Sequence, residues 1–238
     1  MTRHLHAVLL AGLLTVGAPW VAPSPARADQ LVVADARGVA LTPGQSIDAS
    51  QPLKLAAGQR VTLIADNGAT IKLSGPFEGV PDPNNQRGAS IADSLVRLAS
   101  QTTQSTSTLG TVRDAEGAPP TDPWVVDVSA NGHRCVPHGA SVVLWRPANP
   151  AAQTMEIQPI DRAWQAQAPW PAGTDKLAMP ANFPAQDDQG YMVVVNGVSR
   201  TITLHLMPPA IATDKMRAAW MFEKGCTTQA KILAGGLK

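Results

Sequence analysis

The sequence lacks the short motifs that mark the common classes of enzyme. It contains no nucleophile elbow, no phosphate-binding loop and no dinucleotide-binding fingerprint. Its acidic residues are scattered, and the adjacent pair Asp187–Asp188 lies among Pro, Gln and Gly, a context typical of solvent-facing carboxylates. We therefore expect a protein that is not an enzyme and that needs no cofactor.

The sequence also lacks an apolar run long enough to span a bilayer, which takes about 20 residues. The run from Ala7 to Ala18 has about 12 residues and follows a weakly basic start at Arg3. The segment Ala26-Arg27-Ala28, which follows this run, has an A-x-A pattern. This order of features is typical of a secretory signal peptide, residues 1–28, cut after Ala28. We expect a periplasmic protein with no stable membrane insertion after export.

An excess of charge of either sign is missing as well. Residues 29–238 hold 17 basic and 18 acidic side chains, a formal charge of −1. No basic excess is available to neutralise phosphates, which argues against a nucleic-acid partner. The same balance gives no electrostatic reason to bind an anionic membrane surface.

Cysteine is scarce, with only Cys135 and Cys226 in the chain. In an oxidising compartment two cysteines without a competitor are expected to pair. In the chain-entropy model, closing such a loop stabilises a fold by about 4–5 kcal/mol. Cys135 also lies in the cluster 133–138, whose two histidines and thiol suit copper or zinc. That spacing matches no closed structural site, so we expect a disulfide and no metal.

The first part of the chain predicts a small β module at residues 29–101. Its clearest element is a hairpin in which residues 60–65 and 69–73 flank Asp66-Asn67-Gly68. A three-residue loop ending in a left-handed Gly68 pairs Leu63 with Ile71 and Val61 with Leu73. Thr62 and Lys72 then share the opposite face, whereas a two-residue loop would mix the two faces.

This module resembles the periplasmic FecR-type domain over about 45 of the 238 residues. The resemblance rests on turn-and-strand segments at Pro43–Gln45, Gly58–Gln59, Val61–Leu63 and Asp66–Leu73. It implies a small β fold taking part in envelope signalling. FecR proteins cross the inner membrane and act on a sigma factor, whereas this chain is expected to have no such crossing.

A helix and a linker are expected after the hairpin. Ser90 is a suitable N-cap, and Ile91, Leu95 and Leu98 recur at helical spacing, which predicts a helix at 89–101. Residues 102–122 are rich in Ser, Thr and Gln and then in Pro. Such a composition buries little apolar surface and predicts a flexible linker.

Residues 123–238 predict a β-sandwich-like module with a C-terminal helix. Several short strands are separated by turn residues, and Asn196-Gly197 lies between two apolar strands, which is a strong hairpin signal. In the second strand of that hairpin, alternation places His205 on the outer face. A helical period begins after Pro209 or Thr213 and stops at Gly225, so the disulfide is expected to join this helical segment to the sandwich. The fold class predicted for the whole chain is mainly β.

Five tryptophans remain after export, all in the second module. They either fill its core or include an exposed aromatic platform, for which Trp164 and Trp170 are the candidates because polar residues and a Pro turn surround them. We expect a non-catalytic interaction or sensing module of the cell envelope that binds another envelope protein. The alternative is a periplasmic protein that recognises a cell-wall glycan or peptide through these tryptophans.

Overall fold

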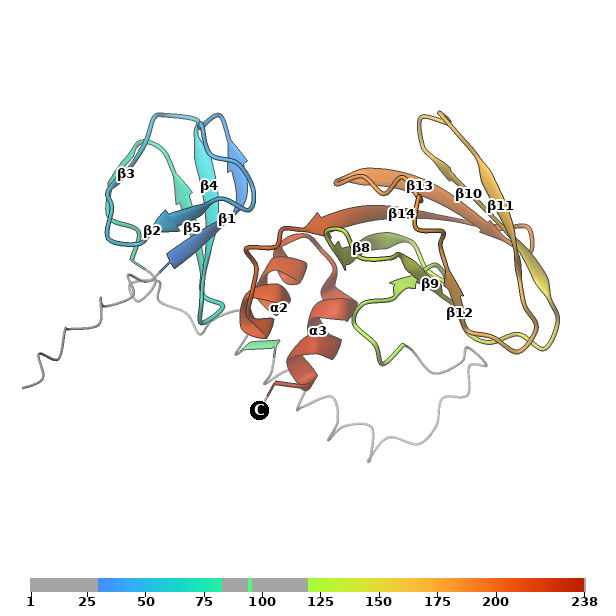
Figure 1. Cartoon of the computed structure of the whole chain (residues 1–238). Coiled ribbons are helices and arrows are strands. Elements are labelled where there is room, and N and C mark those ends of the chain that lie inside the picture. Colours follow the sequence, from blue (N-terminus) through green and yellow to red (C-terminus); the bar gives the residue numbers. More distant parts are fainter. Residues whose placement is uncertain (1–29, 83–93, 96–119, 238) are drawn as a thin grey trace, which may run out of the picture.

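The computed structural model describes residues 30–82, 94–95 and 120–237 of the chain. It is built mainly of strands, with two short helices near the C-terminus, which confirms the mainly-β prediction. Two β bodies lie on either side of these helices (Figure 1). Within the described residues, no helix is both long enough and apolar enough to span a membrane. The predicted signal peptide and most of the predicted linker lie outside the described residues.

The first module is a four-stranded antiparallel sheet with a small two-stranded sheet beside it. The larger sheet has the order β2-β1-β4-β5, and β3 pairs with β6. These strands are β1 (Gln30–Arg37), β2 (Ser46–Asp48), β3 (Leu53–Leu55), β4 (Arg60–Ala65), β5 (Thr70–Ser74) and β6 (Phe77–Gly79). Leu31 and Val33 of β1 enter the module's own core, whereas Val32 and Ala34 enter a second core on the opposite side. The sheet is therefore covered on both faces at this point.

The β4–β5 hairpin has the predicted register. Val61 pairs with Leu73, Thr62 with Lys72, and Leu63 with Ile71. Gly68 has a φ of 80°, and its N–H donates to the carbonyl of Ala65 at 2.8 Å. The left-handed residue predicted to end the loop is thus confirmed.

The second module is a sandwich of two sheets. A five-stranded sheet has the order β11-β10-β13-β14-β8, and a three-stranded sheet has the order β12-β9-β7. Their facing side chains form one core, which includes Trp170. The strands are β7 (Val126–Asp127), β8 (Gly132–Pro137), β9 (Val143–Trp145), β10 (Gln153–Pro159), β11 (Ala166–Trp170), β12 (Lys176–Ala178), β13 (Gln189–Val195) and β14 (Val198–Met207). The predicted β13–β14 hairpin is confirmed, with Asn196 and Gly197 at φ 50° and 77°.

The segment around Cys135 was not predicted to be a strand. It forms β8, which runs parallel to β14 at one edge of the larger sheet. Its partner strand is distant in sequence, so its local pattern is weak. The Pro turn near Trp170 begins after this residue, because Trp170 is the last residue of β11 and pairs with Gln153 of β10.

Two helices follow β14, namely α2 (Asp214–Glu223) and α3 (Thr227–Gly235). The Thr213 side chain caps α2 by accepting the N–H of Met216, and Gly225 ends the segment at φ 80°. Cys226, just before α3, is bonded to Cys135 of β8. The predicted disulfide and C-terminal helical segment are therefore confirmed. Of the helix predicted at 89–101, only Ser94 and Leu95 lie within the described residues.

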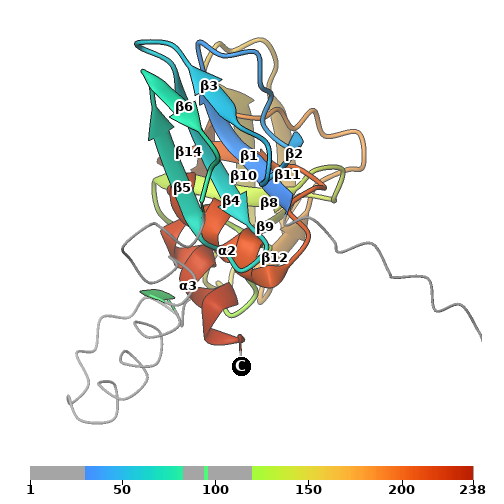
Figure 2. The same ribbon diagram turned by 90° about the vertical axis from the view of Figure 1, so that its left-hand side faces the viewer.

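The second core joins the two modules. Val32, Ala34 and Ile64 of the first module belong to the same buried cluster as Met216 and Trp220 of α2. Polar contacts reinforce the junction, since the Thr213 hydroxyl donates to the Asp66 carbonyl at 3.1 Å and Lys72 pairs with Glu223 at 2.8 Å. Seen from the side of the first module, β4 and β5 lie over α2 (Figure 2).

Candidate functional site

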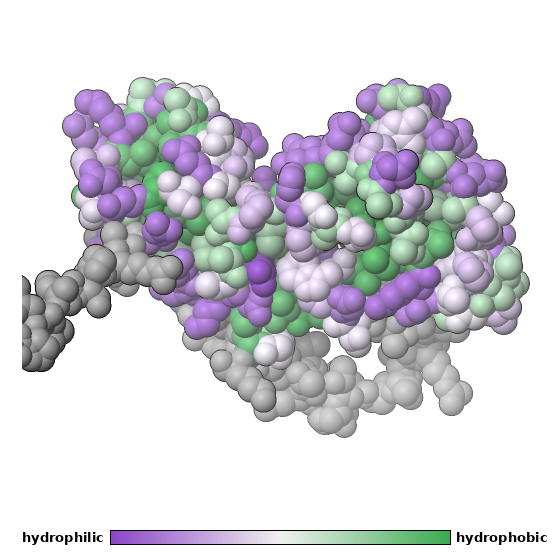
Figure 3. Space-filling view, in the orientation of Figure 1, coloured by the Kyte–Doolittle hydropathy of each residue, from purple (hydrophilic) through white to green (hydrophobic). Residues whose placement is uncertain are grey.

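A polar cleft of about 250 Å³ lies at the junction of the two modules. We call it the inter-module cleft. In the space-filling view the surface is notched between the two β bodies (Figure 3). One wall comes from β1 and β4 and the other from the loop before β13, from β14 and from the end of α2. The residues that line the cleft are Ala34, Asp35, Arg37, Thr62, Asp188, His205, Glu223 and Lys224.

The wall from the first module depends on an irregularity in β1. The register between β1 and β4 shifts between Val33 and Asp35, and beyond the shift Asp35 lies opposite Thr62. Asp35 and Arg37 are two residues apart on one strand, so both side chains project from the same face. Their charged groups are 3.6 Å apart, and both side chains remain exposed.

The opposite wall is built around His205. The loop before β13 is fixed to β14 because the N–H of Leu206 donates to the Asp187 carboxylate at 2.8 Å. Asp188 follows with a φ of 58°, a left-handed conformation that Asp tolerates better than most residues. Its carboxylate lies 3.7 Å from Nδ1 of His205. Local backbone geometry thus brings an exposed carboxylate beside a buried imidazole.

The end of α2 completes the cleft with two opposite charges. One Glu223 oxygen, Oε2, pairs with Lys72 at 2.8 Å, while the other, Oε1, is buried and has no hydrogen-bond partner within the described ranges. The ammonium group of Lys224 lies 5.9 Å from the ring centroid of Trp220. Glu223 is mostly buried, with a side chain that is 13% exposed.

His205 is also bonded to a second histidine. Nδ1 of His133 lies 2.8 Å from Nε2 of His205, and the ring centroids are 5.1 Å apart. These separations fit two nitrogens that point straight at each other and share one hydrogen, with no space for an ion between them. Alternation placed His205 outside, but it is only 4% exposed, because the outer face of β14 is covered at this point.

The pKa of His205 is lowered from its ordinary value. Burial is the main cause, the neighbouring His133 and Lys224 add to it, and Asp188 and Asp187 oppose it. The neutral imidazole is therefore favoured, which is consistent with a hydrogen bond between two histidine rings.

The histidine and cysteine cluster does not assemble a metal site. Within the described ranges, no group of three or more His, Cys, Asp or Glu side chains is placed to hold a metal ion. Cys135 is oxidised, and His138 is exposed at the far end of β8 from His133.

The two candidate tryptophans have different surroundings. Trp170 is 0% exposed, and the guanidinium carbon of Arg146 lies 4.6 Å from its ring centroid. The idea that Trp170 presents an exposed ring is therefore wrong, because β11 turns this residue into the core between the sheets. Trp164 is half-buried and packs edge-on against Phe183, with centroids 5.7 Å apart. The structure does not bring the two rings together as one platform.

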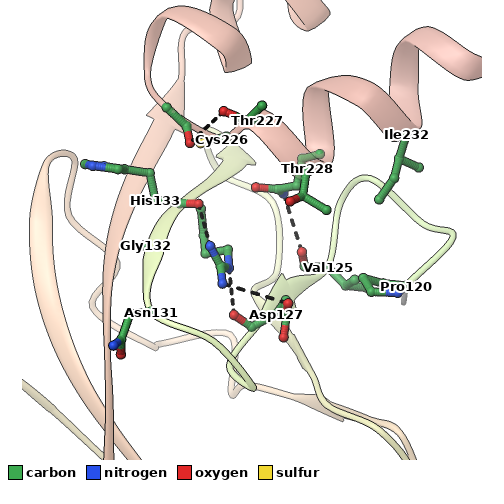
Figure 4. A pocket seen from close by; sticks show the side chains of 13 residues that line it. Pro120, Val125, Asp127, Asn131, Gly132, His133, Cys226, Thr227, Thr228 and Ile232 are labelled. Carbon is green, nitrogen blue, oxygen red and sulfur yellow. Dashed lines mark hydrogen bonds and ion pairs between the residues drawn. The ribbon is translucent and has the colours of Figure 1, made fainter. Parts of the chain in front are cut away.

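Another hollow, of about 210 Å³, opens beside the disulfide. The guanidinium of Arg134 donates through Nε to the carbonyl of Asp127 and through one terminal nitrogen to the carbonyl of His133. Asp127 and His133 are labelled in Figure 4, where dashed lines end at both residues. The other terminal nitrogen of Arg134 donates to the Ala130 carbonyl at 2.8 Å. Because all three nitrogens of this buried cation are engaged by the protein, we assign it a structural role in holding the turn before β8.

The cleft could not be predicted from the sequence. Asp35, Arg37, Glu223 and Lys224 are ordinary charged residues in their local context. Asp188 was predicted to face solvent, and its side chain is indeed 81% exposed. The weak signals were the pair Asp35 and Arg37 at strand spacing and a titratable residue, His205, on the outer face of β14. Neither signal could be connected to α2 without the fold.

Comparisons with protein-family models, with curated proteins and with solved structures gave no match to this chain. They lend no support to the FecR-type resemblance, which stays a prediction from the turn pattern of the first module. The chain is thus defined by its own architecture, a two-module, mainly-β protein with a disulfide and a cleft of mixed charge at the module junction.

Proposed function

We propose that this protein is a non-catalytic interaction and sensing module of the bacterial cell envelope, with the inter-module cleft as its sensing site and the rim of the cleft as its contact with another envelope protein. One observation carries the proposal. The cleft takes its walls from both modules, and two buried polar atoms of its lining residues, Oε1 of Glu223 and Nδ1 of His205, have no hydrogen-bond partner among the described residues. Buried polar groups are normally hydrogen-bonded, so such atoms beside a cleft favour a binding role.

The envelope location is supported by the N-terminal sequence pattern and by the disulfide. An A-x-A site after a short apolar run is typical of an exported chain. The Cys135–Cys226 bond is compatible with an oxidising compartment such as the periplasm.

A non-catalytic role is supported by the surroundings of His205. In the part of the chain that the structure describes, the hydrogen bond of this ring goes to His133. A nucleophilic mechanism would require the ring to be bonded to a hydroxyl or thiol that it activates. Two histidines and an exposed carboxylate are better suited to recognition of a polar group.

Site-specific photo-cross-linking in intact cells tests this proposal. A photoreactive residue at position 37, on the rim of the cleft, is expected to capture an envelope protein. The matched control is position 54, since Lys54 is also a highly exposed strand residue of the first module but lies on β3, away from the cleft. Equal capture at both positions, or none at either, would contradict the proposal.

A further inference from the structure

The inter-module cleft carries unmatched groups of both signs, and these define the chemistry of a ligand. We infer that the cleft binds a small zwitterion, a molecule with an ammonium and a carboxylate a few bonds apart, such as an amino acid or a very short peptide. This inference rests on the proposed binding function and adds to it the class of ligand.

The acceptor side of the cleft consists of Glu223, Asp188 and His205. No donor among the described residues reaches the buried Oε1 of Glu223, although Oε2 of the same carboxylate is paired with Lys72. Asp188 lies close by on the wall shared with His205, and its side chain is 81% exposed. A ligand ammonium group has three N–H donors, which can donate to these acceptor oxygens.

The donor side consists of Lys224 and Arg37. Among the described residues, Lys224 is paired with no carboxylate, and its ammonium group lies over the Trp220 ring. Arg37 makes a 3.6 Å contact with Asp35 through Nε, and in the described part of the chain its exposed guanidinium has two further nitrogens that can bind a carboxylate.

Ligands that carry only one charge fit this cleft less well. A simple anion would approach the carboxylates of Asp35, Asp188 and Glu223, and a simple cation would approach Arg37 and Lys224. Either one gains attraction from one set of groups and loses it to repulsion from the other. A zwitterion can place each of its charges beside the opposite set, so both attractions are kept.

The size of the cleft limits the ligand. Pockets for drug-sized ligands have volumes of about 300–1,000 Å³. At about 250 Å³ the inter-module cleft is smaller. This favours a ligand with few non-hydrogen atoms over an oligosaccharide or a long peptide.

Titration of the full mature protein, followed by NMR at neutral pH and constant ionic strength, tests the inference. The probes are alanine, the dipeptide Ala-Ala, acetate and ethylamine. We expect saturable binding of alanine or Ala-Ala, and at least roughly ten-fold weaker binding of acetate and ethylamine, since each carries only one of the two charges. Preference for alanine assigns the cleft to free amino acids, and preference for Ala-Ala assigns it to peptides.

Charge-removing variants locate the binding. Glu223→Gln and Lys224→Met are each expected to weaken binding by roughly ten-fold, whereas Glu78→Gln and Lys231→Met, which remove the same charges outside the cleft, leave it unchanged. Lys224→Met keeps the Lys72–Glu223 pair and so serves if Glu223→Gln fails to fold.

Two results would overturn the inference. One is saturable binding of neither zwitterion, and the other is binding that both cleft variants leave unchanged. The proposed function is tested separately by cross-linking at position 37. If a partner is captured there but no zwitterion binds, the inferred ligand class is wrong and the proposed interaction function stands.

Discussion

His205 shows how a single residue acquires properties that its own strand does not predict. Alternation along β14 assigns it to the outer face, and the ring does project there. That face is covered by the first module and by the end of α2, so the side chain is buried between Asp188, His133 and Lys224. Its chemistry is therefore set by residues far away in the sequence.

This burial predicts a loss of stability in mild acid. Since the pKa of His205 is lower in the folded protein than the ordinary value of about 6.5, the unfolded chain binds the proton more readily. The contribution of neutral His205 to the free energy of unfolding is fully present above a pH of about 6.5. It is lost as the pH falls from there through the lower pKa of the folded protein. Urea unfolding of the wild type between pH 7.5 and 5.5 measures how steeply the unfolding free energy depends on pH.

Replacing the ring tests the assignment. His205→Gln is expected to reduce the dependence of the unfolding free energy on pH in this range, while His138→Gln, at an exposed histidine of the same module, keeps it. An unchanged slope in His205→Gln would mean that another group titrates.

At the residue scale, local rules predicted the turns well. Gly68 and Asn196-Gly197 take left-handed conformations that few other residues adopt, so the sequence marks them directly. The contact of Asp188 with His205 could not be predicted in this way. It requires the Asp187 carboxylate to accept the N–H of Leu206 beyond the last β13–β14 pair.

At the scale of elements, β8 is a strand that was not predicted from the sequence. It lies at the edge of the larger sheet, where β14 is its one partner among the described strands. Its outer edge is covered by a side chain, because the amide of Gln229 in α3 accepts from the N–H of Cys135 at 2.8 Å and donates to its carbonyl at 2.7 Å. One glutamine thus performs the pairing that a neighbouring strand would otherwise provide.

Loss of this amide is expected to be costly. Gln229→Leu removes the partner of three backbone groups, namely the N–H and the carbonyl of Cys135 and the carbonyl of Pro123, and the side chain that binds them is only 4% exposed. At about 1–3 kcal/mol for each orphaned group, the unfolding free energy should fall by at least about 3 kcal/mol.

Denaturant unfolding with the disulfide intact measures that loss. Thr228→Ala, at the exposed neighbouring position of α3, is the control and should change stability by less than about 0.5 kcal/mol. A Gln229→Leu protein as stable as the control would show that the amide bonds contribute little.

The elements predicted correctly share one property. The β4–β5 hairpin, the β13–β14 hairpin and the capped α2 helix are each specified by residues close together in sequence. The missed strands β2, β6 and β8 are short or have distant partners, so their register depends on tertiary packing.

At the scale of the whole molecule, the two modules share a core. Ile64 of β4 is 0% exposed and lies in the same cluster as Trp220 of α2. We therefore expect one cooperative unfolding transition. Ile64→Ala, a change in the first module, should cost about 2–5 kcal/mol and shift the unfolding transition of the tryptophans, which in the described residues all lie in the second module.

Tryptophan fluorescence in urea measures this coupling. Ile160→Ala is the control, because Ile160 is 55% exposed and its truncation should cost less than about 0.5 kcal/mol. A tryptophan transition that does not move in Ile64→Ala would mean that the modules unfold independently.

The late position of the residues that complete β8 has a consequence for the order of folding. Its partner strand β14, the amide of Gln229 and the thiol of Cys226 all come from chain made after it, and the cysteines are 91 residues apart. Contacts of such high contact order form slowly, since loop-closure entropy is lost before they form. Because the chain is synthesised from its N-terminus, we expect Cys135 to remain a free thiol until α2 and Cys226 have been made. Helices α2 and α3 also cover Val32 and Ile64, so a chain cut short before α2 leaves both modules open at once.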